Sequence, residues 1–102
     1  MAFIKAAAVQ EVPLGTGKQV TLNGKIIALF QVNDAFYAID DTCPHRGGPL
    51  SEGHVEGTEV ICPWHGAGFD LATGAVLSPP ANSGVACYKV QVVGGEVQID
   101  VP

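Results

Sequence analysis

Two short motifs that combine cysteine and histidine constrain this chain more than any other feature of its sequence. The first reads Cys43-Pro44-His45 and, after sixteen further residues, the second reads Cys62-Pro63-Trp64-His65. Sulfur and imidazole ligands favour zinc, copper or iron–sulfur centres over calcium or magnesium. Each motif stands in a segment that contains Pro and Gly, as expected of a loop. The pattern therefore predicts a metal centre held between two loops.

A structural zinc site is the first alternative for these ligands. Zinc sites hold four ligands tetrahedrally, and paired ligands are commonly separated by roughly two to four residues. Only one residue separates Cys43 from His45, and no helix is predicted that could carry the histidines. A [2Fe–2S] cluster fits the pairing better, because each loop can give its Cys to one iron and its His to the other. We therefore predict a [2Fe–2S] cluster, with zinc as the alternative, bound by Cys43, His45, Cys62 and His65.

The composition indicates one small β-rich domain. The chain has 102 residues, of which 47% are hydrophobic and 15% charged, and it contains 13 Gly and 7 Pro. That length supports one modest core, and the Gly and Pro content indicates many turns. No segment of about ten residues or more has a clean helical period. We therefore expect an all-β fold in which antiparallel sheets form a base.

Alternating apolar residues place the longer strands at the two ends of the chain. The Asn23-Gly24 pair is a strong hairpin signal between two of them, and Gly94-Gly95 is a turn between two others. The predicted strands span residues 3–9, 18–22, 25–32, 35–40, 85–93 and 96–101.

The roughly forty residues between these ends have shorter apolar runs and more Gly and Pro. Long irregular segments are uncommon in compact domains unless they are functional. We therefore predict a single domain over residues 1–102, with a base of 1–40 and 82–102. The inserted subdomain, about 41–81, would bind the metal.

The charge balance excludes one broad class of partner. The net charge is −5, with 10 acidic and 5 basic residues, whereas phosphate backbones are bound by clusters of Lys and Arg. The apolar run 26–32 is far too short to span a bilayer, and the N-terminus lacks a signal-peptide pattern. We expect a cytoplasmic monomer that binds neither nucleic acid nor membrane.

Three further residues with reactive or charged side chains receive ordinary structural interpretations. Cys87 is the third cysteine, and since the other two belong to the motifs, no disulfide framework is predicted. It lies in an alternating apolar segment, so we expect a buried, inert thiol. We expect His54 to be a solvated loop residue and Arg46 to be a solvated side chain.

The residues around both motifs resemble the cluster loops of the Rieske family. The resemblance rests on residues 43–50 and 62–66, and residues 78–81, Ser-Pro-Pro-Ala, are similar to the proline loop that the family lays across its cluster. It implies the Rieske fold, with a cluster-binding subdomain at the tip of the base and both His ligands near the surface.

Departures from the family pattern imply a particular kind of member. Respiratory and photosynthetic members have a disulfide at the positions that correspond to Gly48 and Trp64, so that bond cannot form here. They also have a Ser and a Tyr where this chain has Ala67 and Phe69. Losing both hydroxyl hydrogen bonds to sulfur lowers the reduction potential, for which we expect a value on the order of −150 mV.

The resemblance implies a one-electron carrier and not an enzyme. Similar proteins pass electrons from an NAD(P)H-dependent flavoprotein reductase to a terminal oxygenase, such as an aromatic-ring dioxygenase. Two alternatives are the small Rieske subunit of an assimilatory NAD(P)H nitrite reductase and a zinc-stabilised β interaction domain. Trp64 would shield the cluster, contact a partner, or pack in the core. The tip would have an acidic bias that steers a basic partner, from Glu52, Glu56, Glu59 and Asp70.

Overall fold

The regular structure of this protein is almost entirely β. A computed structural model describes residues 2–33, 35–42, 48–64, 66–78 and 84–101. These residues contain no α-helix, and the all-β prediction is confirmed. The strands are β1 Ala2–Ala8, β2 Gly17–Leu22, β3 Lys25–Val32, β4 Ala35–Asp40, β5 His54–Glu56, β6 Glu59–Ile61, β7 Gly68–Asp70, β8 Val76–Ser78, β9 Cys87–Tyr88, β10 Val90–Val93 and β11 Glu96–Val101, and two 3-10 turns are η1 Val9–Glu11 and η2 Leu50–Glu52.

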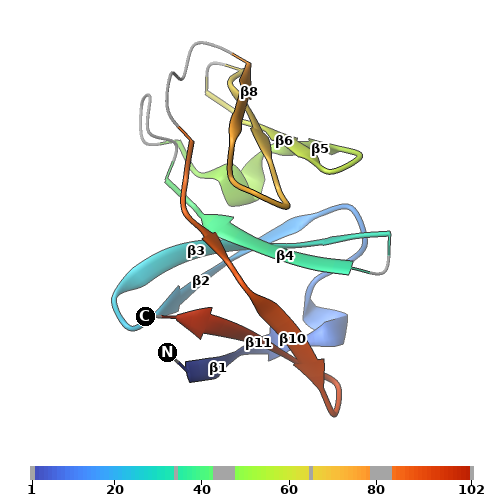
Figure 1. Cartoon of the computed structure of the whole chain (residues 1–102). Helices are drawn as coiled ribbons and strands as arrows, with labels where there is room; N and C mark the ends of the chain where they lie inside the picture. Colours follow the sequence, from blue (N-terminus) through green and yellow to red (C-terminus); the bar gives the residue numbers. More distant parts are fainter. Residues whose placement is uncertain (1, 34, 43–47, 65, 79–83, 102) are drawn as a thin grey trace.

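The strands form three antiparallel sheets that follow one another along the molecule. One end has the order β1-β11-β10, the middle has β2-β3-β4-β9, and the other end has β5-β6-β7-β8. Figure 1 shows β5, β6 and β8 at one end of the molecule and both chain termini toward the other. We call the β5–β8 sheet, together with η2 and the two loops that carry the motifs, the tip.

The predicted hairpin between β2 and β3 is present. Asn23 and Gly24 have φ angles of 52° and 79°, which is the left-handed pair that a two-residue hairpin turn requires. Leu22 then pairs with Lys25, and the register continues to Gly17 opposite Phe30.

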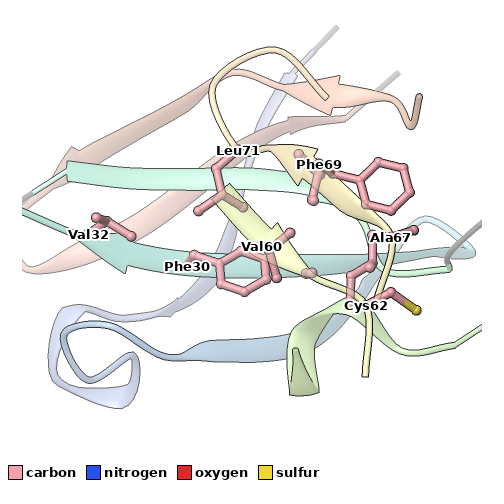
Figure 2. Close-up of a cluster of buried hydrophobic side chains, with 10 residues drawn as sticks. Phe30, Val32, Val60, Cys62, Ala67, Phe69 and Leu71 are labelled. Carbon is pink, nitrogen blue, oxygen red and sulfur yellow. The ribbon is translucent and has the colours of Figure 1, made fainter. Parts of the chain in front are cut away.

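Strand β3 is shared by two hydrophobic cores. Its successive side chains point to opposite faces of the middle sheet, as in any strand. Ile27 and Leu29 are buried in the core that includes β1 and β11. Ala28 and Phe30 are buried in the core beneath the tip, and Figure 2 shows Phe30 packed beside Val60 from β6. One strand therefore contributes side chains to both cores.

One predicted strand, residues 85–93, is wrong as a single element. Within this segment β9 pairs with β4, with Cys87 opposite Ile39, whereas β10 pairs with β11, with Val92 opposite Val97. Lys89 stands between the two short strands. The alternation is real, but periodicity records only which side chains share a face and not where a chain passes from one sheet to another.

The same change of sheet overturns the prediction for Cys87. Its side chain is exposed rather than buried, and its Sγ donates a hydrogen bond to the Ala72 carbonyl oxygen at 3.2 Å. Partial desolvation and the nearby Asp70 carboxylate raise the pKa of this thiol. His54 is solvent-exposed as predicted, but it lies on β5 rather than in a loop, with its Nε2 3.0 Å from Glu56 Oε2.

Candidate metal centre

The loop of the first motif is closed at its base by hydrogen bonds of Asp41. The backbone N–H of Leu50 donates to the Asp41 carbonyl oxygen at 2.7 Å, and the Ser51 N–H donates to Asp41 Oδ1 at 2.7 Å. Thr42 and Pro49 form an isolated antiparallel bridge directly above. Cys43, His45 and Arg46 lie outside the described residues, but both ends of their loop are fixed.

The second motif forms a tight turn closed by its own backbone. The Cys62 N–H donates to the Ala67 carbonyl oxygen at 2.7 Å, and the Gly66 N–H donates to the Cys62 carbonyl oxygen at 3.1 Å. Gly66 has φ of 79°, a left-handed conformation that glycine adopts without strain. His65 lies outside the described residues, between Trp64 and Gly66 of this turn.

Cys62 lies at the boundary between the apolar core and the first loop. The residue is only 3% exposed, and Figure 2 shows it beside Ala67, with its sulfur directed away from Phe30 and Val60. A Cβ atom built on Gly48 would lie 3.1 Å from Cys62 Sγ. A soft, buried sulfur of the second motif therefore faces the first loop, which fits a metal cluster held between the two loops.

The side chain of Trp64 packs against Gly48 on the solvent side. Cγ and Cδ2 of its indole ring would each lie 3.0 Å from a Cβ atom on Gly48, yet the side chain is 56% exposed. Ordinary core packing, one of the three interpretations of Trp64, is therefore wrong. The ring covers Gly48 with one part and leaves a large apolar surface open to solvent.

Two apolar side chains line the inner side of the second loop. Ala67 and Phe69 are fully buried in the core beneath the tip, and Figure 2 shows Ala67 next to Cys62. Neither carries a hydroxyl group, so neither can donate a side-chain hydrogen bond to a sulfur at this position. The two residues that lack the hydroxyl groups of the higher-potential family members are therefore buried in the same core as Cys62, a candidate ligand.

Charge is distributed unevenly between the tip and the rest of the described chain. The acidic residues of the tip are Glu52 on η2, Glu56 on β5, Glu59 on β6 and Asp70 on β7. No described residue of β5–β8 is Lys or Arg, and the four lysines of the chain lie in or beside β1, β2, β3 and β9. The tip therefore has the acidic bias that the sequence predicted.

Of the four predicted ligands, the structure describes Cys62 alone. Cys43, His45 and His65 lie outside the described residues, as do Pro79, Pro80 and Ala81 of the predicted proline loop. The residue that sequence reasoning missed is Asp41. A carboxylate two positions before a predicted ligand was its only signal in the sequence, and nothing there indicated that it would be buried.

Comparison with known proteins decides the family. The model of the Rieske [2Fe-2S] domain matches residues 2–89. The chain belongs to the Rieske [2Fe–2S] family. The cofactor of this Rieske chain is accordingly a [2Fe–2S] cluster of the Rieske type, as the two motifs predicted.

Two similar proteins are ferredoxin components of dioxygenase systems. The naphthalene 1,2-dioxygenase system ferredoxin component of Pseudomonas aeruginosa is 38% identical over 99 residues, covering 97% of this Rieske chain and 95% of that protein. The 3-phenylpropionate/cinnamic acid dioxygenase ferredoxin subunit of Shigella flexneri serotype 5b is 41% identical over 100 residues, covering 97% and 93%. This Rieske protein is therefore an electron-transfer component of the ferredoxin type, as predicted.

A solved complex adds information about partners of such proteins. A chain in the complex of reduced oxygenase and oxidised ferredoxin in carbazole 1,9a-dioxygenase superposes with a TM-score of 0.88 and 36% identity, covering 95% of this Rieske chain and 91% of that chain. A structure assigned as the NADH-dependent nitrite reductase small subunit of Mycobacterium tuberculosis gives 0.87 with 27% identity, covering 96% and 93%. The nitrite reductase alternative thus shares the fold, at lower identity. Among the described residues, no helix has the length and apolar content needed to cross a membrane.

Proposed function

We propose that this Rieske protein carries single electrons from an NAD(P)H-dependent flavoprotein reductase to the terminal oxygenase of an aromatic-ring dioxygenase system. The observation that carries this proposal is the match over nearly the whole chain to ferredoxin components of dioxygenases. The relative whose structure was solved together with its oxygenase supports the oxygenase as the acceptor. We also propose that the protein works as a monomer in the cytoplasm, where a reductase has access to NAD(P)H.

The proposed ligand set is the one that the motifs predict. Cys43 and Cys62 would hold one iron, and His45 and His65 would hold the other, nearer the surface. The bound cluster supplies reversible uptake of one electron. Cys62 supports the assignment, because its buried sulfur faces Gly48 of the loop that carries Cys43 and His45. We further propose that residues 41–81 form the cluster-binding subdomain on a base of 1–40 and 82–102.

The exposed part of Trp64 and the acidic residues of the tip suggest the surface that binds a redox partner. A large exposed aromatic side chain is a common anchor in protein interfaces. Acidic side chains around it would accelerate association with a basic partner surface, more strongly at low ionic strength. The tip therefore combines an apolar contact with long-range electrostatic attraction, which suits the weak and brief binding of redox partners.

Two measurements, made one after the other, test the proposed function. The purified protein should contain two irons and two acid-labile sulfides per chain, with visible absorption bands that bleach on reduction. Mixed with a dioxygenase reductase and NAD(P)H it should be reduced, and then reoxidised by a terminal oxygenase of the same class. A colourless protein with one zinc would contradict the ligand assignment. A coloured protein that reduces nitrite reductase but no oxygenase would contradict the proposed acceptor.

A further inference from the structure

Asp41 is the only buried charged side chain among the residues that the structure describes. It is 2% exposed and immediately follows β4, two positions before the first motif. Burying a carboxylate away from water is costly unless hydrogen bonds compensate. The surroundings of Asp41 must therefore supply those bonds, and they show what this carboxylate holds in place.

Four hydrogen bonds surround Asp41. Its carboxylate accepts one from the Ser51 backbone N–H at 2.7 Å and one from Gln19 Nε2 at 2.6 Å. Its backbone carbonyl oxygen accepts one from the Leu50 N–H at 2.7 Å, and its own N–H donates to the Ile26 carbonyl oxygen at 3.0 Å. Asp41 thus joins β2, β3 and η2 at the point where the first loop begins and ends.

The two motif loops are held closed in different ways. The second loop is closed by backbone hydrogen bonds between Cys62, Gly66 and Ala67, which side-chain substitution leaves in place. The first loop runs through residues 42–49, and its return at Ser51 is fixed by the Asp41 side chain. The first loop also has backbone contacts at Leu50 and Pro49, but it differs from the second in that a side-chain carboxylate adds a further hydrogen bond at its base.

We propose that Asp41 is a positioning residue for the first ligand loop, fixing the place from which Cys43 and His45 reach the cluster. The inference rests on the ligand assignment of the proposed function. Hydrogen bonds to charged groups are stronger than those between neutral groups, so the carboxylate restricts the base of the loop more than a neutral residue would. The Gln19 side chain, on β2, donates to the other oxygen of the same carboxylate, Oδ2.

Neighbouring Asp40 provides a matched control. It is also acidic and lies one residue further from the motif, but its carboxylate accepts hydrogen bonds from Tyr88 Oη at 2.5 Å and from the Ala86 N–H at 3.4 Å. Asp40 therefore holds the segment around β9 and not the base of the first loop. An Asp40→Asn variant removes the same charge near the same place and leaves every hydrogen bond of Asp41 intact.

The test compares Asp41→Ala, Asp41→Asn and Asp40→Asn in the cluster-containing protein. Two quantities are measured: the rate at which an iron chelator removes the cluster, and the width of the EPR lines after reduction with dithionite. For Asp41→Ala we expect cluster loss about tenfold faster, the change that one hydrogen bond to a charged group implies, and broader lines. Asp41→Asn keeps an acceptor for the Ser51 N–H and should lie between Asp41→Ala and the unmodified protein.

Unaltered EPR lines and an unaltered rate of cluster loss in Asp41→Ala would overturn the proposal, even if the variant unfolds at a lower temperature. Faster cluster loss and broader EPR lines in Asp40→Asn would overturn the proposal too, because these effects would then result from the loss of a negative charge alone. If Asp41→Ala does not fold, Gln19→Ala takes its place, because it removes one of the two carboxylate hydrogen bonds from an exposed position. Broader lines in Gln19→Ala support the proposal and unchanged lines refute it. A wrong ligand assignment would instead appear in the unmodified protein, as the absence of a [2Fe–2S] signal.

Discussion

Gly48 of the first loop lies directly against the indole ring of Trp64 in the second. A Cβ atom on Gly48 would approach two ring carbons to 3.0 Å and Cys62 Sγ to 3.1 Å. These distances are tighter than ordinary van der Waals contact, so a side chain larger than hydrogen must displace the ring or the sulfur. The two loops are therefore in contact at the positions where the resemblance places a disulfide in other members.

The first prediction concerns this contact. Gly48→Ala should reduce the free energy of unfolding by about 1–3 kcal/mol, the usual cost of overpacking, and should change the fluorescence of Trp64, the only tryptophan. Chemical unfolding followed by circular dichroism measures the stability of every variant, and an emission spectrum of the folded protein measures the change at Trp64. Adding Trp64→Ala to Gly48→Ala should remove most of the extra cost in a double-mutant cycle. Additive costs would show that the two residues do not constrain one another.

The second prediction concerns the reduction potential. Ala67→Ser and Phe69→Tyr each introduce a hydroxyl group beside the second loop, and each should raise the potential by on the order of 50 mV. That value follows from about 1 kcal/mol per hydrogen bond and 59 mV per tenfold change for one electron. Voltammetry of the purified protein measures it. Phe36→Tyr, which adds a hydroxyl in the core at the other end, is the control and should leave the potential unchanged.

The third prediction concerns stability at high pH. Desolvation and the hydrogen bond to Asp40 raise the pKa of Tyr88 above its ordinary value near 10. A raised pKa means that the folded state holds the proton more tightly, so the stability it contributes is complete below about pH 10 and is lost as the pH rises further. In urea unfolding, Tyr88→Phe should therefore lose less stability between about pH 9 and 11 than the unmodified protein.

A companion variant for that experiment is Cys87→Ser. Desolvation and Asp70 also raise the pKa of the Cys87 thiol above its ordinary value of 9.0, so its contribution is likewise lost as the pH rises. Cys87→Ser separates the effect of thiol ionisation on stability from that of phenol ionisation. The Tyr88→Phe/Cys87→Ser double variant should lose the least stability at alkaline pH. Identical profiles for Tyr88→Phe and the unmodified protein would argue against the Asp40–Tyr88 hydrogen bond as the cause.

The fourth prediction concerns association with the oxygenase. A Glu52→Gln/Glu56→Gln variant removes two negative charges from the tip and should slow electron transfer about twofold to tenfold at low ionic strength. The difference should shrink as salt is added, because screening removes long-range attraction. Stopped-flow mixing at several salt concentrations measures this. Glu96→Gln, at the opposite end beside Lys5, should leave the rate nearly unchanged.

The parts of the fold that sequence predicted well are those governed by local chemistry. The β2–β3 hairpin follows from Asn23-Gly24, a pair that adopts two successive left-handed conformations at little cost. β3 is recognisable from its β-branched and aromatic run. By contrast, the passage from β9 to β10 depends on which strands the segment meets in space, and that choice leaves no periodic signal.

The same distinction applies to the metal centre. The motif that contains Cys62 is recognisable because cysteine and histidine at fixed spacing are rare outside metal sites, and the role of Cys62 as a ligand stays a prediction. Trp64 and Cys87 were harder, because their exposure depends on neighbours distant in sequence. Asp41 could not have been singled out, since its partner Gln19 is 22 positions away and a lone Asp before a loop is usually a solvated turn residue.

The sharing of β3 between two cores has a consequence for the speed of electron transfer. An electron carrier must change charge without first rearranging many atoms. Tightly packed interiors resist small deformations. The side chains of β3 pack in both hydrophobic cores and so connect the core beneath the tip to the remainder of the domain. We expect this common strand to keep the oxidised and reduced shapes nearly identical, so that little energy is spent on reorganisation at each transfer.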